Sequence, residues 1–195
     1  MRKITIVLSC ISLVLYSCEN KSKVDENSSE NKSKVDKNSR QALKTKITEM
    51  EDSISALQKT SSEPIPNLTS IELINRLTAY YTAFPKDEYA ADCLFKLHMK
   101  FSELNAEEKA LEYGDTLLLN FPNYKNRDFI LESMASTYDV LIEPRDTSKV
   151  RYYYSLLLKV KNLPKEKREG VEKRLKYIDL DFFSYIEMKE KVVSR

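Results

Sequence analysis

The sequence predicts an all-α protein, a solenoid of about two and a half antiparallel helix pairs preceded by a signal peptide and a disordered tether. Three observations support this prediction. The 195 residues include only two glycines, whereas a sheet protein with many tight turns needs more. Apolar residues recur at helical spacing from Gln41 onwards. The same apolar pattern also returns before each of three prolines.

The first seventeen residues have the composition of a secretory signal peptide. Arg2 and Lys3 form a basic head, and an apolar run follows over residues 4–16. This run is shorter than the roughly 20 residues that a helix needs to cross a bilayer. We therefore expect residues 1–17 to be removed as a leader.

The end of this leader, Leu15-Tyr16-Ser17-Cys18, resembles the lipobox of bacterial lipoproteins. The resemblance implies cleavage between Ser17 and Cys18 and attachment of acyl chains, such as palmitate, to Cys18. Each buried methylene of an acyl chain contributes about 0.8 kcal/mol, so several chains make a firm anchor. In enteric lipoproteins an aspartate after the cysteine signals inner-membrane retention. Glu19 at that position therefore favours the outer membrane.

Residues 18–40 are expected to be a disordered tether. ENKSKVDENSS is followed directly by ENKSKVDKNSR, a tandem duplication of 11 residues. Each copy contains one apolar residue, Val24 or Val35, so the segment has no stripe to bury. The duplication therefore predicts a spacer between the lipid and the folded domain.

A short amphipathic helix is predicted over residues 41–60, before Pro64 and Pro66. Its apolar residues follow heptad spacing and are Leu43, Ile47, Met50, Ile54 and Leu57. Sustained coiled coils normally need three or four heptads, and this seam has little more than two. Docking on the chain's own domain is therefore favoured over an oligomerising coil, which stays as the alternative.

Three further helices are predicted before Pro85, Pro122 and Pro164. The first covers residues 70–84 and the third about 148–161. Capping boxes at Thr69–Glu72 and Asn105–Glu108 are expected to open the first and second. Counted back from each proline, the apolar residues are Phe84, Tyr81, Leu77 and Ile74; Phe121, Leu118, Gly114 and Leu111; and Leu163, Val160, Leu156 and Tyr153.

The segments after the prolines repeat as well. The residues at equal offsets are Leu94, Leu97, His98 and Phe101 after Pro85, and Leu131, Met134, Ala135 and Tyr138 after Pro122. A helix pair of 37 residues, lengthening to 42 in the next copy, is a period typical of solenoids. We call the helix after each proline the first-type helix and the helix before the next proline the second-type helix.

Residues 91–124 resemble the tetratricopeptide repeat, with Leu94, Leu97, Ala110 and Pro122 in its pattern positions. The resemblance covers residues 69–180, and a short C-terminal helix and tail follow over 181–195. Two departures are expected to offset each other, because His98 stands at the pattern's small position and Gly114 at its large one. In its whole organisation the chain resembles small outer-membrane lipoproteins of Bacteroidota and, distantly, BamD-like proteins.

No catalytic or metal-binding set is recognisable in the sequence. Two glycines cannot build a phosphate-binding loop, and one histidine cannot build a two-histidine metal site. His98 is expected to be a packed core histidine, and Cys93 a small buried hydrophobe. We therefore expect a protein that is not an enzyme and that needs no cofactor and no metal.

The helix over residues 89–104 carries more apolar residues than one core face requires, and its surplus residues Phe95 and Met99 point elsewhere. The resemblance implies that first-type helices line a concave groove. The lining residues would be Asp92, Phe95, Met99, Ser102, Phe129, Glu132, Ser136 and Asp139. Helix 41–60 or a partner peptide would cover this surplus.

These features together predict a lipid-anchored adaptor that binds another protein in a bacterial envelope. The periplasmic face of the outer membrane is the expected location. The alternative is a surface-displayed structural lipoprotein without a specific peptide groove. The net charge of +2 comes from Arg2 and Lys3, which leave with the leader, so nucleic acid is not expected as a partner.

Overall fold

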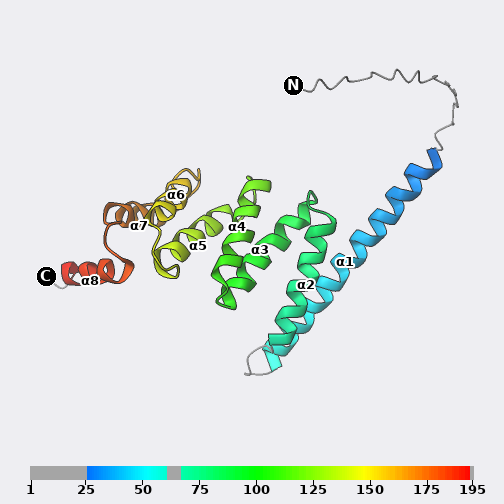
Figure 1. The fold of residues 1–195 in the computed structure, drawn as a ribbon, viewed down its shortest axis with the longest axis horizontal. Coiled ribbons are helices and arrows are strands. Elements are labelled where there is room, and N and C mark those ends of the chain that lie inside the picture. The colour runs from blue at the N-terminus through cyan, green and yellow to red at the C-terminus, as the bar shows by residue number, and fades with distance from the viewer. Residues whose placement is uncertain (1–25, 61–66, 194–195) are drawn as a thin grey trace, which may run out of the picture. The chain divides into compact units, whose positions relative to one another are not determined.

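The computed structural model describes the backbone of residues 26–60 and 67–193 and the side chains of residues 37–60 and 68–191. Every regular element in these ranges is an α-helix (Figure 1), which confirms the predicted all-α class for the described residues. The helices are α1 (Glu26–Thr60), α2 (Asn67–Ala83), α3 (Glu88–Glu103), α4 (Glu107–Asn120), α5 (Arg127–Val140), α6 (Thr147–Leu157), α7 (Lys165–Lys176) and α8 (Phe182–Val193). Contacts divide the chain after Asp36, and the packing described below belongs to the unit that starts at Lys37.

Helices that follow one another in the sequence also pack against one another. The closest pairs are α3 with α4 and α5 with α6, and α2 packs on α3. Figure 1 shows these helices folding back on one another in order along the unit. This sequential neighbour packing is consistent with the predicted helical-repeat arrangement.

The core repeats with the predicted period. In α3 the buried residues include Cys93, Leu94, Leu97 and His98. The residues at the equivalent positions of α5, which are Ile130, Leu131, Met134 and Ala135, are also buried. Each set falls on one helix face because residues three and four positions apart lie on the same side of a helix. The second-type helices α2 and α4 repeat in the same way. Their buried residues are Leu73, Ile74, Leu77 and Tyr80, and then Ala110, Leu111, Gly114 and Leu117.

The third second-type helix differs from the prediction, which extended it to Lys161. Helix α6 ends at Leu157, and hydrogen-bonded turns continue the chain towards Pro164. The Arg168 side chain stabilises these turns, since its Nη1 donates to the Leu158 carbonyl at 2.8 Å and its Nη2 to the Val160 carbonyl at 3.3 Å. Of the residues predicted by counting back from Pro164, Tyr153 and Leu163 are buried, and Leu156 and Val160 are partly buried against the core. The count missed the other buried residues of α6, which are Val150, Tyr154 and Leu157.

The capping box predicted at Asn105 does not form. Asn105 has a φ of 53° and ends α3 instead of opening α4. The Asn105 N–H donates to the Ser102 carbonyl and the Ala106 N–H to the Phe101 carbonyl, which is the Schellman arrangement. Asparagine suits this position because it tolerates the left-handed conformation.

Helix α1 is longer than the sequence predicted. It begins at Glu26 and so includes residues that were expected to belong to the disordered tether. No glycine or proline stands between Glu26 and Thr60 to end a helix. The predicted signal peptide and the acylated Cys18 lie outside the described residues.

The described part of α1 docks on the chain's own unit. Ile47 and Ile54 are buried in one apolar cluster with Leu77 of α2 and Leu97 of α3. Polar contacts reinforce this packing, because Arg76 Nη1 donates to the Lys46 carbonyl at 2.7 Å. The expectation that this helix docks on its own domain is confirmed. It packs against both α2 and α3.

The large His98 side chain and the missing side chain of Gly114 compensate each other in the core, as the sequence analysis expected. A Cβ atom built on Gly114 would lie 2.4 Å from Met134 Sδ and 3.1 Å from His98 Nδ1. Met134 and His98 are both fully buried, so neither side chain has free space into which it can move. Gly114 therefore provides the volume that the large imidazole at position 98 occupies.

A Gly114→Ala substitution tests this fit. Overpacking a full core costs roughly 1–3 kcal/mol, which exceeds the gain of about 1 kcal/mol in helix propensity. We expect the free energy of unfolding in urea to fall. Gly170→Ala in α7 is the matched control, since its Cβ would meet no atom within 4 Å, and it should raise stability by about 1 kcal/mol. Equal effects of the two substitutions would contradict this packing.

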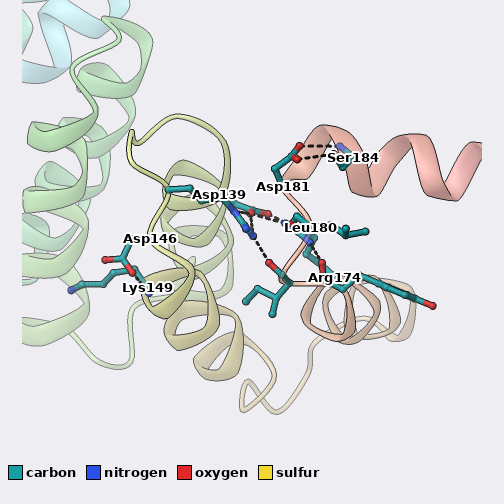
Figure 2. A network of polar contacts seen from close by, with 10 residues as sticks. Asp139, Asp146, Lys149, Arg174, Leu180, Asp181 and Ser184 are labelled. Carbon is teal, nitrogen blue, oxygen red and sulfur yellow. Dashed lines mark hydrogen bonds and ion pairs between the residues drawn. The ribbon is translucent and has the colours of Figure 1, made fainter.

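The C-terminal helices are held by a buried ion cluster, which Figure 2 shows around Asp139 and Arg174. Arg174 donates two hydrogen bonds of 2.7 and 2.8 Å to the Asp139 carboxylate, and Arg145 donates a third of 2.7 Å. The guanidinium groups also donate to three carbonyls, those of Tyr177, Ile178 and Leu180. The cluster thereby joins the end of α5 to α7 and to the turn that leads into α8.

Asp139→Asn should destabilise the domain strongly. The substitution keeps the shape of the side chain but leaves two buried guanidinium groups without their anion, a loss of about 3–5 kcal/mol. Urea unfolding followed by circular dichroism measures the change. Asp179→Asn, at an exposed carboxylate in the nearby turn, should stay within about 0.5 kcal/mol. A loss for Asp139→Asn as small as for this control would refute the anchoring role.

Candidate functional site

An aromatic group lies where the sequence predicted the centre of a groove. Phe95 of α3 lies 5.7 Å, between ring centroids, from Tyr124 and 5.9 Å from Phe129 of α5. Phe129 meets Phe95 edge to face, an arrangement that aromatic rings favour. Phe129 keeps 42% of its surface exposed. Two of the eight predicted lining residues are thus brought together, and Tyr124, which the sequence analysis did not assign to the site, joins them.

Polar contacts fix the position of the Tyr124 ring. Its hydroxyl donates to Asp92 at 2.8 Å, and Lys125 Nζ lies 3.1 Å from the same carboxylate. Burial raises the pKa of Tyr124, and the hydrogen bond to Asp92 adds to this effect, so the hydroxyl stays protonated. Asp92 therefore acts as a positioning residue for the aromatic group, and we name Phe95, Tyr124 and Phe129 the aromatic triad.

A hollow of about 650 Å³ lies next to the aromatic triad. The first turns of α3, residues 120–125 and Lys44 of α1 form its walls. Asp92 and Tyr124 line it, so the hollow and the triad share residues. Its volume is within the range of sites that hold a side chain or a small ligand.

Met99 has a different environment from Phe95. It lines a smaller hollow of about 190 Å³ together with Ile54 of α1 and Leu73 of α2. Close by, Lys96 binds Glu51 of α1 at 2.6 Å. Helix α1 therefore lies beside Met99, whereas Tyr124 and Phe129 contact Phe95.

The remaining predicted lining residues are divided between surface and core. Ser102 is half-buried, Glu132 accepts a hydrogen bond from Lys167 of α7 at 2.7 Å, and Ser136 lies beside the Tyr154 hydroxyl. Asp139 does not line a groove, because its side chain is 1% exposed and is bound by Arg174 and Arg145. The prediction failed at Asp139 because Arg174, the residue that draws this carboxylate inward, lies on another helix.

His98 is a packed core residue, as expected. It is completely buried, with Nδ1 2.8 Å from the Ala110 carbonyl and Nε2 2.9 Å from the Ser133 hydroxyl. The carbonyl can only accept, so Nδ1 carries the hydrogen and Nε2 accepts from Ser133. Burial lowers the pKa of His98 below its ordinary value of 6.5, against the effect of the Ala110 carbonyl. The imidazole is neutral and bridges three helices.

The lowered pKa makes stability depend on pH. Above about pH 6.5 the imidazole is neutral in both the folded and the unfolded chain, so its contribution is complete. Below that pH the unfolded chain takes up the proton first, and the free energy of unfolding falls by up to about 1.4 kcal/mol per pH unit. Urea unfolding at pH 7.5, 6.5 and 5.5 measures this decline. His98→Gln should remove most of this pH dependence between pH 7.5 and 5.5. If the free energy of unfolding of the variant fell with pH as steeply as that of the natural chain, His98 would not be its source.

The other side chains that could react or bind a metal ion are also buried or far apart. Cys93 is fully buried, and burial raises the pKa of its thiol to about 12, which disfavours the reactive thiolate. Within residues 26–60 and 67–193, no three His, Cys, Asp or Glu side chains lie close enough to hold a metal ion. None of the helices described is long and apolar enough to cross a membrane.

Comparison with known proteins identifies no family. The chain matches no protein-family model, no curated protein and no solved structure. The fold is thus that of an all-helical protein whose eight described helices pack with their sequence neighbours.

Proposed function

We propose that the chain is a lipid-anchored adaptor of a bacterial envelope that binds another protein at the aromatic triad. The main support is the exposed edge of this triad, where Phe129 is 42% exposed. Tyr124, a second member of the triad, lines a hollow of about 650 Å³. Aromatic side chains in such positions commonly contribute the largest part of a protein–protein binding energy. Phe95 packs against the Phe129 ring and Tyr124 packs against Phe95, which restrains Phe129 and lowers the entropy lost on binding.

A binding role fits the chemistry of the described residues better than catalysis does. The one histidine uses both ring nitrogens in buried hydrogen bonds. The Cys93 thiol is buried and protonated. A catalytic base or nucleophile must reach its substrate, and neither of these groups can. The proposed role is therefore recognition of a partner protein.

The tetratricopeptide-like character of the repeats belongs to the same proposal. Residues 37 apart occupy equivalent core positions in α3 and α5, a period near the roughly 34 residues of that family. The lipobox-like Leu15–Cys18 motif supports an acyl anchor on the outer membrane, with the domain on the periplasmic side. The duplicated segment after Cys18 would set the distance between the anchor and the partner.

Phe129→Ala tests the adaptor role in cells. A photo-reactive amino acid placed at Phe95 in the full chain should crosslink a discrete partner, which mass spectrometry can identify. Phe129→Ala should then weaken the affinity for that partner roughly 30-fold, the effect of losing about 2 kcal/mol at an aromatic anchor. Leu68→Ala removes an apolar side chain that is 78% exposed on α2 and is the matched control. Unchanged affinity in the Phe129 variant would rule out the triad as the binding site.

Cys18→Ala tests the anchor. Metabolic labelling with a fatty acid should mark the natural chain and not the variant, because the sulfur atom that carries the diacylglycerol is lost. The variant should also leave the membrane fraction. Cys10→Ala is the control and should keep both label and location. Labelling that survives in Cys18→Ala would exclude the lipobox assignment.

A further inference from the structure

The outward faces of α4 and α6 carry opposite charges. Glu108, Glu112 and Leu119 lie on one exposed face of α4, on the side opposite its buried residues. In α6 the corresponding exposed face carries Arg151 and Tyr152. The two helices are neighbours in space, since the Tyr153 hydroxyl of α6 donates to Asp115 of α4 at 2.6 Å.

The face of α6 is basic and contains a hollow of about 430 Å³. Its lining consists of Thr147, Ser148, Arg151, Tyr152, Ser155, Leu156 and Lys159. Among the residues that the structure describes, no carboxylate lines this hollow, whereas Glu or Asp lines the hollows near α1, α3 and α4. The bias extends beyond the hollow, because residues 145–165 contain six basic side chains and one acidic side chain, Asp146.

The face of α4 is acidic with one apolar residue. Glu108 and Glu112 are exposed, and Asp115 follows one turn later. Leu119 at the end of the row is 81% exposed, although a leucine gains most from burial. Lys109 pairs with Glu112 at 2.6 Å, but the two side chains are 57% and 60% exposed, so this pair contributes little to stability.

We propose that these two faces bind each other between two copies of this chain. In a two-fold dimer each surface patch meets the same patch of its partner. If the axis runs parallel to α4 and α6, α4 of one copy lies on α6 of the other, and the contact occurs twice. Each acidic row then faces a basic row. An axis perpendicular to these helices would place α4 on α4 and bring like charges together.

The positions of the charged residues along the two helices are compatible with this arrangement. Helix α4 starts at Glu107 and α6 at Thr147, and in the proposed dimer they run in the same direction. Arg151 is the fifth residue of α6, and Glu108 and Glu112 are the second and sixth residues of α4, so helices that start level would place the guanidinium group between the two carboxylates. Leu119 lies near the level of Leu156 and of the Lys159 stem, so its apolar surface meets apolar atoms.

The size of the patch indicates a weak dimer. Two adjacent helices of 14 and 11 residues present roughly 400 Å² at ~1.5 Å rise per residue and ~10 Å separation. Stable complexes bury about 800 Å² on each partner. We expect a dissociation constant of roughly 10–100 μM at low salt that rises as salt screens the charges. This dimer face lies on second-type helices, so it goes beyond the proposed adaptor function and does not depend on it.

Charge reversal on one helix at a time tests the proposal. The full chain in mild detergent is examined by sedimentation velocity at 50 and 500 mM salt, and the natural chain should dimerise at low salt. Arg151→Glu with Lys159→Glu should abolish the dimer, and so should Glu108→Lys with Glu112→Lys. All these residues are exposed, so circular dichroism and urea unfolding should be unchanged.

A mixture of the two double variants is the decisive experiment. Each alone would oppose like charges at both contacts, but together they place an acidic face against a basic face twice. They should therefore form a heterodimer, with an affinity near that of the natural chain. The fourfold variant, with all charges exchanged, should dimerise by itself. The proposal would be overturned if neither the mixture of double variants nor the fourfold variant formed a dimer. It would also be overturned if all variants dimerised as the natural chain does, which would indicate association through the apolar N-terminal run.

A photo-crosslinker at Tyr152 identifies the occupant in cells. It should give a covalent product of twice the chain's mass that contains only this protein, whereas the same probe at Leu68 should not. Crosslinks from Tyr152 to a different protein, with none to a second copy, would overturn the proposal. The adaptor function has its own readout, the heterologous partner crosslinked from Phe95, so either proposal can fail while the other stands.

Discussion

The structure depends on one constraint, that no helix pair can bury its apolar face by itself. Leu97 of α3 packs in one apolar cluster with residues of α1 and α2, whereas Leu94 packs in a second cluster with α4, α5 and α6, which also contains Leu131 and Met134. Stability is therefore shared between neighbours instead of being concentrated in a single core. The aromatic triad lies on α3, α5 and the segment before α5, whereas the charged faces lie on α4 and α6.

The two proposed surfaces have a joint consequence for binding. A dimer formed through second-type helices leaves both aromatic triads open, one on each copy. A partner that carries two binding segments could then engage both, and its second binding step would be intramolecular. Anchoring in a membrane would raise the local concentration of the chain, which suits a contact that is weak in solution.

The sequence was a good guide wherever a pattern was local or repeated. Apolar spacing predicted the helices and the equivalence of α3 and α5, and it identified His98 and Gly114 as exceptional positions. The failures have physical causes. Asn105 suits both a helix start and a left-handed helix end, and only the preceding turn decides between these roles. Asp139 had the spacing of a surface residue, and its burial depends on two arginines, one of them on another helix.

Helix α7 buries an arginine, Arg174, beside Val171, whereas α3 buries Leu94 and Leu97 and α5 buries Leu131 and Met134. The buried charge restricts which surfaces could pack against α7. A further helix pair stacked after α7 would have to pack against a guanidinium group already committed to Asp139, and against a helix whose outer residues are charged. New units could be accommodated more easily upstream, between pairs that meet through leucine and methionine. An added helix pair would therefore disturb the packing less if it were inserted between the upstream pairs than if it were stacked on α7.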